Sequence, residues 1–133
     1  MKIVRGRTGT SDDRTDNGTV SGGGAWGDPV LAEETLSVYH VFFEPRARTH
    51  WHRHERGQLL IVTSGRGLLA TREGDAGVLE VGDSAWIPPG EEHWHGGAPA
   101  SFLMHTAVSL GEPQWLDAVS DEDYERAAAA AGA

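Results

Sequence analysis

Three histidines, His50, His52 and His54, fall at every second position of one short stretch, and Gln58 follows four residues after the last of them. In an extended strand, alternate residues share one face, so this spacing predicts three imidazoles that point the same way. Imidazole is the commonest metal-ligating side chain in proteins. The stretch therefore indicates a metal site, although an HxH pair by itself is more typical of a half-buried strand.

A second pair, His93 and His95, lies far downstream, just after the turn residues Pro88-Pro89-Gly90. Both pairs can hold one ion only if the fold brings them together. The chain has no cysteine, which excludes disulfides, thiolate zinc sites and a cysteine nucleophile. Any metal must therefore be held by nitrogen and oxygen ligands.

Short strands separated by turn residues are predicted between and around these pairs. Ser64–Gly67 is expected to be a hairpin turn in which Gly65 and Gly67 adopt positive φ. Regular spacing of short strands is typical of a β-sandwich or barrel. The strands are expected at residues 36–44, 48–54, 58–63, 68–72, 77–81, 84–87, 92–95 and 101–110.

The two ends of the chain differ from this pattern. Residues 1–25 form a polar, glycine-rich arm, with a short strand expected around Thr19 and Val20. Residues 120–130 are expected to form a helix, because Ser120 can cap its N-terminus and alanines follow from Ala127. With 133 residues, the chain suits one domain, residues 1–133.

Charge and hydropathy exclude several classes of partner. A formal net charge of −9 disfavours binding to nucleic acid or to anionic membranes. The longest aliphatic run, Leu59–Val62, is too short to span a bilayer. The N-terminus reaches no apolar segment, so no signal peptide and a cytoplasmic location are expected.

Two motifs at characteristic spacing then indicate a family. The chain resembles the cupins, and the resemblance covers roughly residues 36–124. It implies an all-β fold, the cupin double-stranded β-helix (a jelly-roll barrel), with a short C-terminal helix. The first motif is an HxH pair, an acid or amide and a glycine, matched by His52, His54, Gln58 and Gly65. The second motif is matched by Gly82, Pro88, Gly90 and His93.

A longer pattern, WHxHxxGQ followed by PGEEHWHG and MHTA, is similar to small bacterial cupins that include manganese-dependent hydroxynitrile lyases. This resemblance implies a divalent metal ion, with Mn expected and Fe, Zn, Ni or Co open. It implies His105 as a catalytic residue and, by analogy, a homodimer. The implied metal ligands are His52, His54, Gln58 and His93.

The substrate pocket is expected to involve five further residues. His50 and Tyr39 stand where these lyases tend to carry smaller side chains, and Thr49 can place a hydroxyl near the cavity. Tyr39 and Val41 share one strand face, so His40 between them is expected to point away. Two roles remain open for His95: a hydrogen bond to one of the metal ligands, or ordinary polar packing. The expected pocket residues are Tyr39, Val41, Thr49, His50 and His95.

Three functions remain in competition. Three imidazoles and the Gln58 amide carry no negative charge, so a dication keeps its full charge, which favours Lewis-acid chemistry. The first hypothesis is a lyase acting on a small hydroxy or keto compound, with cyanohydrin cleavage as the nearest precedent. The second is an Fe(II)-dependent dioxygenase. The third is a small-molecule-binding cupin without catalytic activity.

Overall fold

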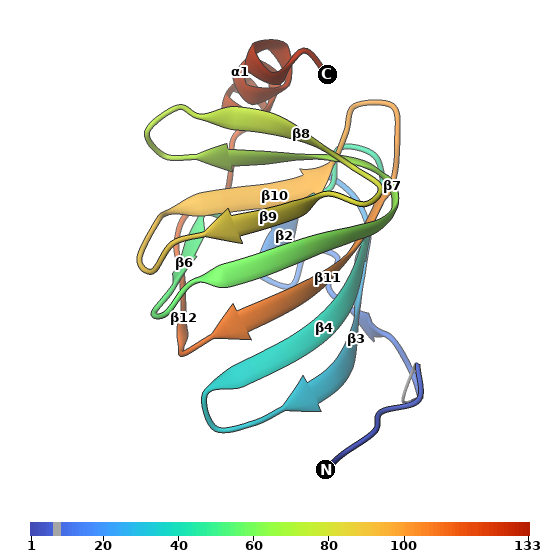
Figure 1. The fold of residues 1–133 in the computed structure, drawn as a ribbon. Coiled ribbons are helices and arrows are strands. Elements are labelled where there is room, and N and C mark those ends of the chain that lie inside the picture. Colours follow the sequence, from blue (N-terminus) through green and yellow to red (C-terminus); the bar gives the residue numbers. More distant parts are fainter. Residues whose placement is uncertain (7–8) are drawn as a thin grey trace.

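Antiparallel strands make up most of the computed structural model, which describes residues 1–6 and 9–133. Residues 7 and 8 of the N-terminal arm lie outside the described residues. The strands curl into a half-barrel, with one helix at its end (Figure 1). The elements are β1 (Asp12–Asp13), β2 (Val20–Ser21), β3 (Ala25–Ala32), β4 (Leu36–Phe43), β5 (Arg48–Thr49), β6 (His52–His54), β7 (Gln58–Thr71), β8 (Ala76–Glu80), β9 (Ser84–Ile87), β10 (His93–Gly97), β11 (Leu103–Leu110), β12 (Pro113–Trp115) and α1 (Asp121–Ala131).

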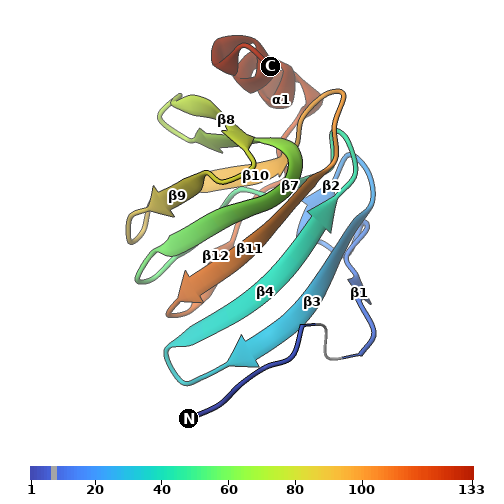
Figure 2. The same cartoon turned by 45° about the vertical axis from the view of Figure 1, so that its right-hand side comes forward.

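The sheet order places strands from distant parts of the chain side by side. Its main path runs β1-β3-β4-β11-β7-β10-β5-β2, and β6 pairs with both β10 and β12. Figure 2 shows β3, β4, β11 and β7 as one curved layer. The predicted all-β barrel with a short C-terminal helix is confirmed.

The predicted hairpin at Ser64–Gly67 is wrong, because residues 58–71 form the single long strand β7. Its first half pairs with β11 and β9, and its second half pairs with β10 and β8. Gly65 has the positive φ of 76°, but Gly67 does not. A Cβ at Gly65 would lie 2.1 Å from the Phe102 carbonyl oxygen, so glycine allows the strand to bend there while continuing.

The predicted strand 48–54 is also interrupted. The chain forms β5 at Arg48–Thr49 and β6 at His52–His54, with a break at His50 and Trp51. Thr49 and His52 both line the barrel cavity, whereas His50 does not, although strict alternation would place Thr49 and His52 on opposite faces. The break therefore shifts the alternation by one residue, and His50 no longer shares a face with His52 and His54.

Three strands were not predicted from the sequence: the two-residue β1, β3 and β12. β3 was difficult to predict because it contains Gly27 and Pro29, and both residue types are depleted in strands. Its pairing with β4 shifts register near Pro29. β12 is only three residues long, and it pairs with β6 so that Trp115 lies opposite His52. β12 matters for the site, because its Pro113 and Trp115 line the space beside the histidines.

The helix α1 lies at one end of the barrel (Figure 1), and the predicted short C-terminal helix is confirmed. Ser120 accepts a hydrogen bond from the Asp123 backbone N–H at 3.0 Å, which is a normal N-cap. Trp94 packs against Tyr124 beneath the helix, so β10 is buried on both faces. The buried Arg48 donates to the Val119 carbonyl at 2.7 Å and to Asp121 at 2.8 Å, which ties β5 to the start of α1. In the described part of the chain, no helix is long and apolar enough to cross a membrane.

Candidate metal centre and adjoining pocket

Three strands bring the candidate ligands together. His52 and His54 lie on β6, and β10 pairs with β6 so that His93 is directly opposite His52. Gln58 begins β7, which pairs with the other side of β10. The two histidine pairs, separated by almost forty residues of sequence, therefore meet because β10 lies between β6 and β7.

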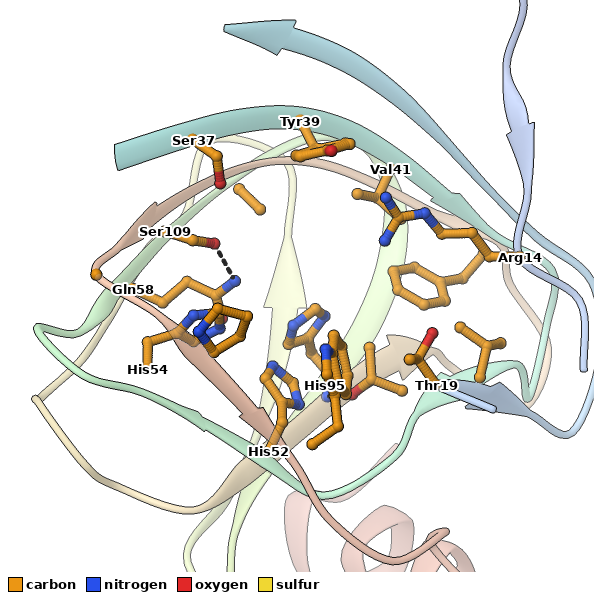
Figure 3. A pocket seen from close by; sticks show the side chains of 17 residues that line it. Arg14, Thr19, Ser37, Tyr39, Val41, His52, His54, Gln58, His95 and Ser109 are labelled. Carbon is orange, nitrogen blue, oxygen red and sulfur yellow. Dashed lines mark hydrogen bonds between the residues drawn. The ribbon is translucent and has the colours of Figure 1, made fainter. Parts of the chain in front are cut away.

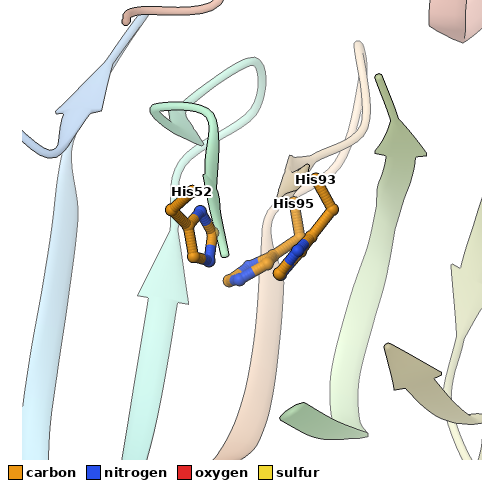
Figure 4. Close-up of side chains that lie close together, drawn as sticks. All are labelled: His52, His93 and His95. Atoms are coloured by element: carbon orange, nitrogen blue, oxygen red, sulfur yellow. The ribbon is translucent and has the colours of Figure 1, made fainter. Parts of the chain in front are cut away.

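The rings are close enough to share an ion. Ring centroids lie 4.2 Å apart for His52 and His93, 5.1 Å for His52 and His54, and 5.8 Å for His54 and His93. One ligand atom from each of His52, His93 and His95 forms a group whose members all lie within 4.8 Å of one another (Figure 4). This buried three-histidine cluster could bind a metal ion.

Hydrogen bonds to the backbone set the orientation of two of these rings. His52 Nδ1 donates to the His50 carbonyl at 2.9 Å, and His93 Nδ1 donates to the Glu91 carbonyl at 2.9 Å. A carbonyl only accepts, so Nδ1 carries the proton in each neutral ring and Nε2 keeps a lone pair. Metal-binding histidines typically use this arrangement.

The contact between His93 and Gln58 tests whether a metal fits. His93 Nε2 lies 2.9 Å from Gln58 Oε1, while the Gln58 amide nitrogen donates to Ser109 Oγ at 3.0 Å. As placed, two lone pairs face each other without a proton between them. Either the amide turns over, or a cation lies beside both atoms. Two donors each ~2.1 Å from an ion and at right angles are ~3 Å apart, which matches the observed spacing.

The unpaired nitrogens of His54 favour the cation. Both Nδ1 and Nε2 of this ring are buried and have no hydrogen-bond partner in the described part of the chain. An ion beside Gln58 Oε1 and His93 Nε2 could also use one of the His54 lone pairs. The residues present therefore fit a divalent metal.

The three candidate ligand histidines are electrically neutral near pH 7. Burial lowers the pKa of His54 and of His93 from 6.5 to about 4, with the positive form of His93 adding to the effect at His54. Burial, followed by the His93 charge, holds the pKa of His52 well below 6.5. Deprotonated imidazoles are what a metal requires, so the site is ready for a cation without first releasing protons.

A second histidine pair adjoins the centre. His105 Nε2 and His95 Nδ1 lie 3.0 Å apart, and both side chains are fully buried. Burial lowers the pKa of His105 to about 4, and burial with the charges of His105 and His52 keeps the pKa of His95 well below 6.5. Two neutral rings share one hydrogen bond, so the His105 tautomer decides whether His95 Nε2 carries a proton or a lone pair.

A cavity of about 300 Å³ opens beside this centre. Figure 3 shows its lining, with Gln58 and His54 at one end and the hydrogen bond from Gln58 to Ser109. Four of the five predicted pocket residues line it: Tyr39, Val41, Thr49 and His95. His40 hydrogen-bonds to Thr106 Oγ1 and is not among the lining residues, as predicted.

One pocket prediction, His50, is wrong, and the predicted catalytic residue His105 lies outside the cavity lining. His50 does not belong to the lining, because the break after β5 turns it away from His52 and His54. His105 is not in the lining either, and it contacts the lining residue His95 instead. A role for His105 must therefore act through His95.

Several lining residues were not predicted from the sequence, and three of them bear on the chemistry of the site. Trp115 of β12 stacks on His52, with centroids 4.5 Å apart, and Ser109 of β11 holds the Gln58 amide. Arg14 reaches the cavity from the N-terminal arm. Of these three residues, only Ser109 could have been predicted from the sequence, because it is four residues after His105 and so lies on the same, inner face of the strand.

Comparisons with known proteins agree with this architecture. A family model described as Cupin domain matches residues 39–106. The chain is 47% identical over 105 residues to an (R)-mandelonitrile lyase of Granulicella tundricola, a match that covers 74% of this chain and 76% of that protein.

Solved structures extend the comparison to nearly the whole chain. A cupin-like protein from Thermotoga maritima has a TM-score of 0.81 and 36% identity, covering 96% of this chain and 97% of its own. A polyketide cyclase from Streptomyces resistomycificus has a TM-score of 0.68 at 18% identity, covering 94% and 91%, and shares the fold alone.

Proposed function

The chain belongs to the cupin domain family, and we propose that it is a divalent-metal-dependent lyase that cleaves small hydroxynitriles into a carbonyl compound and hydrogen cyanide. One observation carries the proposal. Every side chain that could hold the ion is neutral, and the adjoining cavity has no carboxylate among its described lining residues. A dication there keeps its full charge, which suits Lewis-acid chemistry. The 47% identity to a mandelonitrile lyase supports the same reaction.

We assign the ion to His52, His54, Gln58 and His93, with Mn²⁺ as the native metal. The resemblance of the motif supports this set, and so do the Nε2 lone pair of His93 beside Gln58 Oε1 and the unpaired nitrogens of His54. His95 is the competing ligand, because its nitrogen lies in the group with His52 and His93. We place His95 beside the ion, because the motif resemblance that supplies the four ligands does not include it.

The ion, when bound, makes the substrate hydroxyl more acidic. His95 faces the cavity, and its Nε2 has no partner in the described part of the chain. If His95 Nδ1–H donates to His105 Nε2, the His95 Nε2 lone pair can accept the hydroxyl proton. The C–C bond to the nitrile then breaks, the carbonyl forms, and cyanide leaves with the proton from His95. The low pKa of His95 favours the return of that proton.

The reaction itself can be tested with racemic mandelonitrile. We expect release of benzaldehyde and cyanide, loss of activity after chelation of the metal, and recovery on adding Mn²⁺. Benzaldehyde absorbance measures the rate, and mass spectrometry measures the metal content. Activity should persist without oxygen, since no electrons are transferred. Full activity in metal-free protein would contradict the proposal, and a strict oxygen requirement would favour the dioxygenase.

His105 is proposed as a positioning residue that selects the His95 tautomer. Replacing His105 by leucine is expected to lower kcat by ~10²-fold, the usual contribution of a positioned acid–base group, with KM and metal content unchanged. Glutamine, whose amide oxygen can still accept from His95, should recover part of the loss. A purely structural role predicts instead equal losses in both variants that follow their thermal stability, and full activity in the leucine variant would reject the assignment.

A further inference from the structure

Arg14 is an arginine from the N-terminal arm that lies inside the cavity wall. Its backbone N–H donates to the Ala25 carbonyl at 2.8 Å, which attaches this part of the arm to β3. Its guanidinium carbon lies 4.8 Å from the centre of the Tyr39 ring. A Cβ at Gly27 would lie 2.6 Å from Arg14 Nε, so the absence of a side chain at Gly27 lets Arg14 cross β3. The side chain is therefore held in position and is half-buried.

The charge of Arg14 is not matched by an acid. Among the described residues that line the cavity there is no aspartate or glutamate, and Arg14 is the only lysine or arginine. No ion pair to Arg14 occurs in the described part of the chain, although the chain carries twenty acidic residues against eleven basic ones. An acidic protein that leaves one guanidinium unmatched inside an otherwise uncharged pocket has a cavity suited to an anion.

Arg14 and the candidate metal ligands lie at different ends of the cavity. Figure 3 shows Arg14 beside Val41, well separated from Gln58 and His54, with Tyr39 on the wall between them. A ligand whose reacting oxygen lies at the histidine end would extend along Tyr39 towards the guanidinium. A guanidinium offers parallel N–H donors in one plane, which match the two oxygens of a carboxylate.

We propose that Arg14 is a specificity-determining residue that binds a carboxylate at the end of the substrate remote from its reacting oxygen. The substrate class is then a small hydroxy or keto compound that carries a distal carboxylate. The location of the reacting end rests on the proposed function, whereas the anion-binding role of Arg14 does not.

A binding experiment tests the anion-binding role of Arg14 separately from the proposed reaction. The probes are 4-formylbenzoate and its neutral counterpart 4-formylbenzamide, which have nearly the same shape, and calorimetry measures their affinities for the purified protein at low salt. We expect the carboxylate to bind at least ~10-fold more tightly, as charge-assisted hydrogen bonds to a half-buried guanidinium imply. The ratio should fall to near one in Arg14→Met and should stay partly elevated in Arg14→Lys.

Arg66→Met is the matched control. It removes the same charge from an exposed ion pair with Glu80, away from the cavity, and should keep the wild-type ratio. An unchanged ratio in Arg14→Met would overturn the inference, even if that variant is less stable, because Arg14 would then only support Tyr39. A carboxylate preference in a protein that cleaves no hydroxynitrile would reject only the proposed reaction. Cleavage of mandelonitrile without any such preference would reject only the role of Arg14.

Discussion

Replacing His93 by alanine is expected to yield a folded protein that retains no divalent metal and cleaves no mandelonitrile. His93 lies where the candidate ligands meet. Its ring centroid is 4.2 Å from that of His52, and its Nε2 atom is 2.9 Å from Gln58 Oε1. Substitutions beside a metal ligand cost ~10–100-fold in metal affinity or activity, and loss of a ligand should cost more. Metal content per chain and the rate of benzaldehyde release measure the two effects.

The same measurement decides between the two possible ligand sets. If His54 and Gln58 complete the site, His54→Ala should lose the metal, whereas His95→Ala should keep the metal and lose turnover. If His95 is a ligand instead, the metal contents of these two variants are reversed. His40→Ala is the control, because His40 lies on the same barrel but bonds to Thr106 and does not line the cavity. Full metal content in His93→Ala would reject the site.

The candidate centre was predictable because its signals are local. His52 and His54 are two residues apart, so any strand places them on one face, and the resemblance supplied Gln58 and His93. His50 obeyed the same rule and was assigned wrongly. Its position depends on the break after β5, where the His50 backbone N–H donates to the Thr19 carbonyl of the N-terminal arm at 2.7 Å. Local periodicity cannot anticipate a bond to a segment thirty residues away.

The remaining errors have the same origin. The glycines at 65 and 67 are typical of a hairpin turn, but Gly65 serves as a bend because Phe102, the residue just before β11, approaches its backbone. Arg14 belongs to a stretch whose polar composition predicts an exposed arm, and only the pairing of β1 with β3 brings it to the cavity. The homodimer and the cytoplasmic location remain predictions.

Acid should unfold the metal-free protein between about pH 6.5 and about pH 4. Burial lowers the pKa of His54, His93 and His105 from 6.5 to about 4 and takes His52 and His95 well below 6.5. Above 6.5, neither the folded nor the unfolded state holds these protons. Below 6.5, the unfolded chain binds them first, so the free energy of unfolding decreases as the pH falls, and the part due to His54, His93 and His105 is complete near pH 4.

The size of this effect is on the order of the whole stability of a domain. A pKa lowered by this amount corresponds to ~3 kcal/mol for one ring, and several such rings approach the ~5–15 kcal/mol that keep a typical domain folded. Circular dichroism during an acid titration of chelator-treated protein measures the midpoint. His50→Gln should leave the midpoint unchanged, since His50 lies outside the buried cluster. A native spectrum at pH 4 without metal would contradict this account.

Metal should move that midpoint to lower pH. An ion binds only the deprotonated imidazoles of the folded state, so it stabilises the folded protein and competes with protons for the same lone pairs. We therefore expect Mn²⁺-loaded wild-type protein to unfold at a lower pH than metal-free protein, and His93→Ala to show the same midpoint with and without Mn²⁺. An equal shift in both proteins would mean that the ion acts elsewhere, because only the buried centre couples metal binding to these protons.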